Sequence, residues 1–486
     1  MNIKVYIAVF LGGFFYCPLL AQNLIYQPSN PQITRENWLD IGLQQWNTAQ
    51  RKKGFFKYDS LYLISNKDSL GAMVSATPVF AFWAGKEIGQ DGRKHQNSRG
   101  LLITGGYKRF SCFAMIMENQ AFLPKYQTLF IESHGEFYPG SNAYTQQNGM
   151  VPGGGRTKPF KTSGFDYAYS QGSMQWEISK RISLIGGNGN LRLGDGFRSL
   201  FWSNHNQVPL IGGSIKINPH LQYLFMKGRL FDLIRKPKYA NVESPYYKKG
   251  YSMNALIYSH KKYSAGVVYQ TIWEGGDSIR ERPVSSWYWI PLPGLDGLAK
   301  PRVSLPQWGV VGRIEPIPNF VIYGEGFLRG FEKKALSYQL GINFQPILTT
   351  SLTLRLNMAF LRVGDSFYGE NYALSFTSNN LPLGSLMGNG TRELLFAGRL
   401  GYKRLYVDLI LQYYTASAGK NVLFKETFSP ENQVAHGVVE MGFMVNPAAQ
   451  CVVFSLCDLR YGNIMSKTML FTFGVKTALF PNHHVY

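Results

Sequence analysis

The sequence predicts an all-β protein: a transmembrane antiparallel β-barrel of about 18 strands with a short N-terminal periplasmic helical segment. Three observations support this fold class. The 486 residues include 15% aromatic but only 16% charged side chains, which is little charge for a water-soluble chain of this length. After the N-terminus no run of ~18 apolar residues occurs, so a transmembrane helix is excluded. Finally, long stretches alternate apolar and polar side chains.

The alternating stretches are long enough to cross a bilayer as tilted strands, which takes ~9–11 residues each. Their polar faces carry residues that suit a lumen, such as Gln339, Arg355 and Asn357. A soluble sandwich would bury the apolar face inward, whereas a membrane barrel turns it toward lipid. We therefore expect the apolar faces to be lipid-facing in the following segments: 111–117 (with Phe113, Met115 and Met117), 221–225, 338–345, 352–360, 405–414 and 469–480.

The N-terminus predicts export and divides the chain into three parts. Lys4, an apolar core from Val5 to Phe15 and the end at Leu19-Leu20-Ala21 indicate a signal peptide over 1–21. Residues 22–60 form the predicted periplasmic segment, with a helix over 33–51, and 61–486 form the barrel. Export of a barrel implies the outer membrane of a bacterium as its location.

Net charge and cysteine usage limit the partners. The formal charge of +21 favours an anionic partner such as acidic surface polysaccharide or lipopolysaccharide, beside the outer-membrane lipid itself. No zinc finger, RNA-recognition motif or basic helix is present, so nucleic acid is not expected. The four cysteines have no metal-ligand spacing, and Cys451 and Cys457 would lie too far apart on one strand to form a disulfide.

Catalytic motifs are missing from the sequence. It contains no phosphate-binding loop, no HExxH and no GxSxG, and Gly187-Asn188-Gly189 does not complete a GxGxxG. We therefore expect no enzymatic activity, no cofactor and no metal site.

One glycine-rich stretch is the candidate functional segment. Residues 182–213 begin as a strand and reach Gly194-Asp195-Gly196-Phe197-Arg198-Ser199. Such glycines indicate a sharp turn or a close approach of the backbone. The segment is either a structural loop or part of a binding surface, and Asp195 and Arg198 either contact a ligand or pair with each other. The surrounding bases and one aromatic residue are candidates for contacts with an acidic polysaccharide: Arg156, Lys158, Lys161, Arg192, Arg198 and Trp202.

These motifs resemble the Wzi-type capsule-assembly outer-membrane proteins, in the branch of Bacteroidetes that includes members linked to gliding motility. The resemblance covers about 98–213 and rests on the following residues: Glu118-Asn119-Gln120, Pro124, Val151-Pro152-Gly153, Arg156, Lys161, Asp166-Tyr167, Gly194 to Leu200, and Ser203-Asn204. Phe197 stands where the family pattern has Tyr, and Phe201-Trp202 stand where it has leucines.

The resemblance implies an 18-stranded barrel with a small periplasmic helical part and a lectin-like, non-catalytic role. Such a protein would hold surface polysaccharide during capsule or exopolysaccharide assembly. Two alternatives stay open. The same cations could line a porin-like, anion-selective channel, or the barrel could be an accessory of a gliding or secretion machinery with envelope protein partners.

Overall fold

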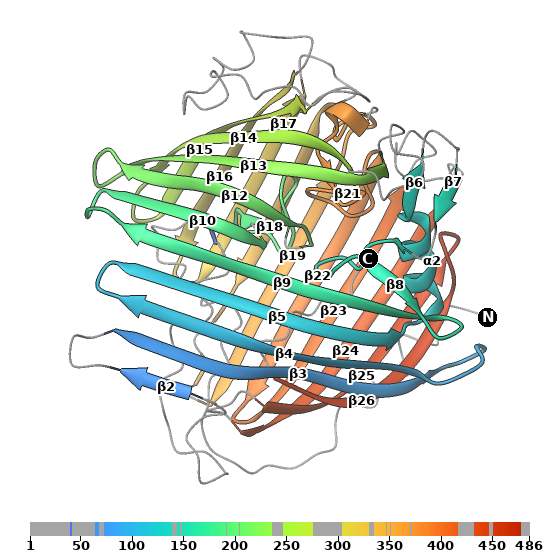
Figure 1. Cartoon of the computed structure of the whole chain (residues 1–486). Helices are drawn as coiled ribbons and strands as arrows, with labels where there is room; N and C mark the ends of the chain where they lie inside the picture. Colours follow the sequence, from blue (N-terminus) through green and yellow to red (C-terminus); the bar gives the residue numbers. More distant parts are fainter. Residues whose placement is uncertain are drawn as a thin grey trace.

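The computed structural model of the chain is a closed antiparallel β-barrel (Figure 1). It describes residues 72–138, 148–190, 192–203, 205–235, 246–275, 304–329, 335–346, 348–349, 351–369, 372–416, 432–446 and 451–477. It also gives the backbone of three short strands at 39–40, 64–67 and 143–145. The predicted signal peptide over 1–21 lies outside the described residues.

Eighteen strands form the closed wall in the described part of the chain, which confirms the predicted fold class. The first nine are β3 (Met73–Glu87), β4 (Lys94–Tyr107), β5 (Phe110–Phe122), β9 (Gly164–Glu177), β10 (Ile182–Asn190), β12 (Gln207–Lys216), β13 (Leu221–Arg235), β14 (Tyr246–Ser259) and β15 (Tyr263–Glu274). The others are β16 (Ser304–Ile317), β17 (Phe320–Arg329), β18 (Ser337–Phe344), β19 (Leu352–Arg362), β22 (Thr391–Tyr402), β23 (Leu405–Ala416), β24 (Gln433–Asn446), β25 (Cys451–Gly462) and β26 (Thr468–Thr477).

The barrel closes between its last and first wall strands. β26 pairs with β3 in an antiparallel register that runs from Leu470 opposite Glu87 to Lys476 opposite Ala81. Closure gives the backbone N–H and C=O groups of both edge strands hydrogen-bond partners, which lipid could not supply. β2 (Ile64–Lys67) adds a short arm to the N-terminal part of β3.

The remaining elements belong to connections between wall strands. The connection from β5 to β9 contains α2 (Lys125–Ser133), β6 (Glu136–Tyr138), β7 (Ala143–Thr145) and β8 (Thr157–Phe160). The connection from β10 to β12 contains β11 (Arg192–Leu193), and the one from β19 to β22 contains η3 (Tyr372–Leu374), β20 (Thr377–Ser378) and β21 (Leu381–Pro382).

The helix predicted over 33–51 is wrong at the two residues that the structure describes. Leu39–Asp40 form strand β1, which pairs with Arg192–Leu193 of β11. Helical periodicity could not reveal this pairing, because the partner strand lies about 150 residues further along the chain and local propensity yields to such tertiary contacts. The rest of the predicted helix lies outside the described residues.

The two rims of the barrel differ in the length of their connections. Very short turns form one rim, which we call the short-turn rim: 108–109, 178–181, 217–220, 260–262, 318–319 and 403–404. The long connections 123–163, 191–206 and 363–390 all leave from the opposite, long-loop rim. In outer-membrane barrels the short turns face the periplasm and the long loops face the exterior.

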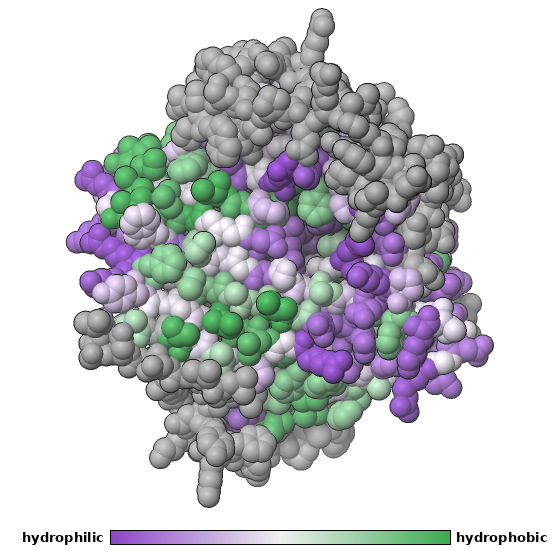
Figure 2. All heavy atoms as spheres, viewed as in Figure 1, coloured by the Kyte–Doolittle hydropathy of each residue, from purple (hydrophilic) through white to green (hydrophobic). Residues whose placement is uncertain are grey.

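Most outward side chains along the wall are apolar, as the alternation predicts. Leu340, Met358 and Phe473 are 59%, 50% and 65% exposed, while the alternating residues Gln339, Ala359 and Thr472 are buried. Figure 2 shows hydrophobic side chains along the middle of the visible wall and hydrophilic ones toward its two ends. This band is the surface that a transmembrane barrel turns toward lipid.

The segment 111–117 breaks this pattern and corrects our expectation for it. Phe113, Met115 and Met117 are at most 5% exposed and face the lumen, whereas Ile116 between them is 62% exposed and faces outward. They pack in a lumen-side cluster with residues of neighbouring strands, including Val79, Leu102, Tyr169 and Ile185. β5 is therefore apolar on both faces, so its alternation could not show which face is inside.

Two further expectations concern helices and thiols. Within the described ranges no helix is long and apolar enough to span a membrane. Cys451 and Cys457 are both free, as their six-residue spacing on β25 predicts.

Candidate functional site: a filled lumen and a basic rim

The glycine-rich segment 191–206 folds from the long-loop rim into the lumen. Gly194 has a φ of 98°, a left-handed conformation that glycine adopts without strain. A Cβ at this position would lie 2.2 Å from Oε1 of Glu325 on β17. Both the turn and the close approach to the wall therefore require a glycine here.

Asp195 and Arg198 each pair with a charged residue of the wall. The Asp195 carboxylate accepts a hydrogen bond of 2.8 Å from Nη1 of Arg313 on β16. Nη1 of Arg198 lies 3.2 Å from the carboxylate of Glu393 on β22. These pairs, both largely shielded from water, fix the two ends of the Gly194–Ser199 turn to strands more than a hundred residues away.

Backbone atoms of the same segment are bound by wall side chains. The amide side chains of Asn343 and Gln339 donate to the carbonyls of Asp195 and Arg198, at 2.7 and 2.9 Å. The Glu325 carboxylate accepts from the Ser199 hydroxyl at 3.1 Å and from the Leu200 N–H at 2.9 Å. A buried connection needs such partners, because its backbone groups have no water to bind.

The end of the segment forms an apolar core inside the barrel. Leu200, Phe201 and Trp202 are at most 1% exposed and belong to a cluster that includes side chains of β14, β17 and the 363–390 connection. The rings of Trp202 and Tyr251 pack edge to face with their centres 4.8 Å apart, and the ring centres of Phe201 and Phe327 are 4.9 Å apart. Trp202 therefore has no face exposed on which a sugar ring could stack.

The 363–390 connection closes over this core from the other side of the lumen. The Tyr368 hydroxyl donates to the Leu200 carbonyl and accepts from the Ser385 N–H. The Ser203 N–H donates to the Leu383 carbonyl at 2.8 Å. The side chains of His205 and Asn206 both reach the Pro382 carbonyl. The two connections are thus joined along their length.

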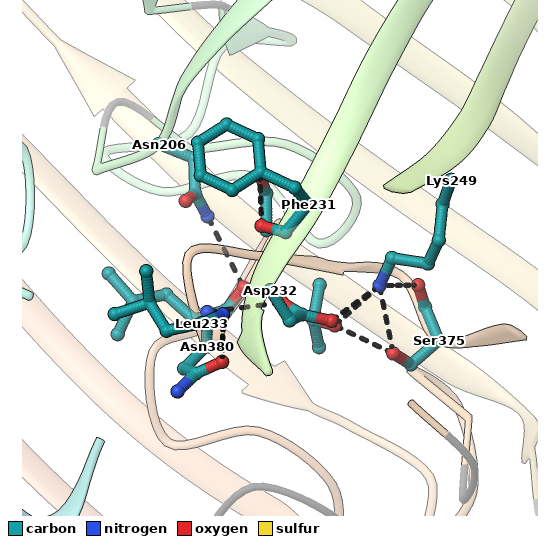
Figure 3. Close-up of polar contacts among 10 residues, drawn as sticks. Asn206, Phe231, Asp232, Leu233, Lys249, Ser375 and Asn380 are labelled. Carbon is teal, nitrogen blue, oxygen red and sulfur yellow. Dashed lines mark hydrogen bonds and ion pairs between the residues drawn. The ribbon is translucent and has the colours of Figure 1, made fainter. Parts of the chain in front are cut away.

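A buried ion pair ties the 363–390 connection to the wall, as Figure 3 shows. Nζ of Lys249 on β14 lies 2.7 Å from the carboxylate of Asp232 on β13 and also donates to Ser375 and Thr377. Asp232 accepts in addition from the Asn380 N–H at 3.0 Å. Both charges are at most 3% exposed, and each has several partners, as a buried charge requires.

The 123–163 connection is bound to the long-loop ends of wall strands β3 and β25. Glu87 at the end of β3 accepts from the Lys125 N–H at 3.0 Å, at the positive N-terminus of α2. The Tyr126 hydroxyl donates to Asp458 at 2.9 Å, and Asp458 also binds His436. Tyr126 and Phe130 pack with Leu381, Leu386 and Met387 of the 363–390 connection. We call the described parts of these three connections the plug.

Of the predicted basic residues, Arg198 lies in the lumen, whereas Arg156, Lys158 and Lys161 lie in the 123–163 connection at the long-loop rim. Arg156 binds the Tyr246 hydroxyl and lies 4.0 Å from the carboxylate of Glu136. Lys158 and Lys161 are exposed on and after β8, and Nζ of Lys161 lies 5.3 Å from the centre of the Phe160 ring. The structure gives the backbone of Arg192, which pairs with Asp40, but not its side chain.

Sequence reasoning missed the wall residues that hold the plug. Glu325, Glu393 and Asp232 are acidic residues at inward positions of wall strands, with 4%, 2% and 1% exposure. An acidic residue inside an otherwise alternating strand is a signal that could have found them, but nothing local shows which loop they bind. Among the described residues no cluster of His, Cys, Asp and Glu could hold a metal ion.

Comparisons with known proteins identify the fold. No protein-family model matches the chain, and no curated protein matches its sequence. The structure is similar to that of Wzi of Escherichia coli, an outer-membrane protein involved in group 1 capsule assembly and described as a carbohydrate-binding β-barrel. The TM-score is 0.54 at 12% identity, over 82% of this chain and 83% of that one.

Two further solved structures show lower similarity. A BenF-like porin from Pseudomonas fluorescens has a TM-score of 0.43 at 10% identity, over 83% of this chain and 97% of that one. OccAB4 of Acinetobacter baumannii has a TM-score of 0.46 at 9% identity, over 85% and 98%. The closed barrel of 18 wall strands and its similarity to Wzi show that the chain has the fold of the 18-stranded outer-membrane β-barrels.

Proposed function

We propose that this protein is a non-catalytic outer-membrane barrel that binds acidic surface polysaccharide at its long-loop rim, as part of capsule or exopolysaccharide assembly. The observation that carries the proposal is the filled lumen. Leu200, Phe201 and Trp202 sit in a dry aromatic core at the centre of the plug, where a porin would hold water. A barrel filled in this way offers its ligand a rim and not a pore.

The rim near β8 has the chemistry that an acidic glycan requires. Lys158 and Lys161 supply exposed charge, and Arg156 lies just inside them. Aromatic rings lie near these cations. The ring centres of His95 and Phe122 are 4.9 Å apart, and those of Phe122 and Phe160 are 5.9 Å apart. Cations bind the carboxylates of acidic sugars, and ring faces stack on their apolar sides.

The residues of the glycine-rich motif have a supporting role in this proposal. Asp195, Arg198 and Trp202 bind the wall and the plug core, so we assign them to the filling of the lumen and not to direct contact with the glycan. Arg192 stays a candidate contact. The similarity to Wzi supports this reading, since that protein binds carbohydrate on a barrel of the same architecture.

Polysaccharide binding tests the proposal directly. The purified, detergent-folded protein is titrated with the producing organism's own acidic polysaccharide at low and at high salt. We expect binding that weakens with salt and that falls at least fivefold in a Lys158→Gln/Lys161→Gln variant. The matched control is Lys261→Gln/Lys262→Gln, which removes the same charge from exposed residues of the short-turn rim.

Two results would contradict the proposal. One is no binding at either salt concentration by a folded barrel. The other is an equal loss of binding in the rim variant and in the matched control, because net charge alone would then account for the affinity.

A further inference from the structure

Two arginines form a like-charged pair on the outward face of the barrel. Arg362 ends β19, Arg392 lies at the start of β22, and the two residues are direct partners in the antiparallel register. Both are exposed. They point outward, because they alternate in phase with Phe360 and Leu394, which are 38% and 54% exposed. Like charges directly opposite each other in a sheet are destabilising.

The neighbouring strands do not neutralise this pair. Tyr338 on β18 stands opposite Arg362, and Thr415 on β23 stands opposite Arg392. Asp365 follows Arg362 by three residues, but in the described part of the chain no ion pair joins it to either arginine. Another outward arginine on the wall has an acidic cross-strand partner: Arg99 on β4 stands directly opposite Glu118 on β5.

The arginine pair lies at the outer edge of the lipid-facing band. From Leu352 the outward positions of β19 are apolar up to Phe360, and Arg362 comes next. Ten residues of strand at ~3.4 Å each, tilted by ~40°, rise about 26 Å. The apolar band of outer-membrane barrels is ~25 Å tall. The arginines therefore stand at the level of the headgroups of the outer leaflet.

We propose that Arg362 and Arg392 together bind a phosphate of a phosphorylated glycolipid in the outer leaflet. Guanidinium groups hold phosphate through paired N–H donors, and an anion between two arginines removes their repulsion. The acyl chains of the same molecule would lie on the apolar surface below, formed by Phe360, Leu394 and Leu340. This site is separate from the polysaccharide rim and does not depend on the proposed function.

Lipid binding to the purified full-length barrel tests the site. Bisphosphorylated lipid A and enzymatically dephosphorylated lipid A are titrated in detergent, and bound lipid is counted by native mass spectrometry. We expect an Arg362→Gln/Arg392→Gln variant to bind the phosphorylated lipid at least tenfold more weakly than the wild type. The dephosphorylated lipid should bind both proteins alike, and millimolar inorganic phosphate should not displace the intact lipid, because it lacks the acyl contacts.

A charge-matched control separates this site from a general effect of charge. Lys108→Gln/Arg109→Gln removes the same two charges from the short-turn rim and should leave lipid A affinity unchanged. The lipid-free arginine variant should unfold at the same or a higher denaturant concentration than the wild type, since it loses a repulsion. Wild-type affinity in the folded arginine variant, or an equal loss in the control, would overturn the proposal.

Discussion

The two sides of the lumen are built from different chemistry. On the side of β3, β4, β5, β9 and β10, inward residues such as Val79, Leu102 and Met115 pack against one another. On the side of β16 to β26, many inward residues are polar or charged, and a separate apolar cluster includes Val438, Val452 and Phe454 of β24 and β25. Examples of the polar and charged residues are Glu325, Gln339 and Glu393, which bind the plug, and Glu440, which pairs with Lys476 at 2.7 Å.

This difference shows how one barrel holds an inserted segment. The apolar side packs partly against itself and, through Phe165 and Tyr167, against Ile131 and Val151 of the 123–163 connection. The polar side supplies the carboxylates and amides that the backbone of 191–206 would otherwise find in water. The glycine-rich segment therefore lies against the polar side, where Glu325, Gln339 and Asn343 bind its backbone.

Removing a plug anchor on the polar side should have the largest effect. Glu393→Ala leaves the Arg198 guanidinium largely buried without its carboxylate, and breaking such a pair costs about 3–5 kcal/mol. We expect the free energy of unfolding in urea to fall by this amount and lumen conductance to appear in planar bilayers. Glu393→Gln, which keeps an acceptor, should lose less. Wild-type stability for Glu393→Ala would mean that Arg198 does not depend on this carboxylate.

A cavity on the apolar side should destabilise the wall without opening the lumen. Met115→Ala removes a side chain that is 1% exposed, and such large-to-small changes cost about 2–4 kcal/mol. The matched control is Met174→Ala on the adjacent strand β9, where the side chain is 56% exposed and faces outward. Urea unfolding should show a smaller loss for the control. Equal losses would remove the distinction between lumen and lipid faces at β5.

The plug should also lose stability in acid. Burial lowers the pKa of His205 to about 4, and the nearby Arg198 charge lowers it too, although the Pro382 carbonyl opposes both. The unfolded chain binds this proton near its usual pKa of ~6.5. Stability is therefore full above pH ~6.5 and is lost as the pH falls toward 4, by up to about 3 kcal/mol.

Substitution distinguishes the contribution of His205 to the pH dependence of stability from that of a second buried histidine, His134. Burial lowers the pKa of His134 at the end of α2 to about 4 as well, so His205→Gln should remove only part of the acid dependence. Urea midpoints measured between pH 7 and pH 4 would show this. A pH dependence that is unchanged in the variant would contradict a buried, neutral His205.

The sequence analysis predicted the inward and outward faces of the strands correctly on the polar side of the lumen, but not at β5 on the apolar side. On the polar side, the alternation around Gln339, Arg355 and Asp408 assigned the inward face correctly, because a polar interior and an apolar exterior differ in residue type. On the apolar side it failed at Phe113, Met115 and Met117, because lipid and a dry interior select the same residues.

The candidate site was predictable only in part. Gly194 marked a close approach of the backbone, and the structure supplies the reason in Glu325. The partners of Asp195 and Arg198 were out of reach, since Arg313 and Glu393 lie more than a hundred residues further along the chain. Trp202 looked like a sugar-stacking residue, but burial in the plug, which no local pattern encodes, removed it from the surface.

Single-channel recording of the wild-type protein in planar bilayers tests the filled lumen most directly. We predict conductance near the background of the empty bilayer, and porin-like steps only when an anchor such as Glu393 is replaced by alanine. Stable, anion-selective steps from the wild-type protein would contradict the account. They would show that the lumen is an open path and that its cations serve transport.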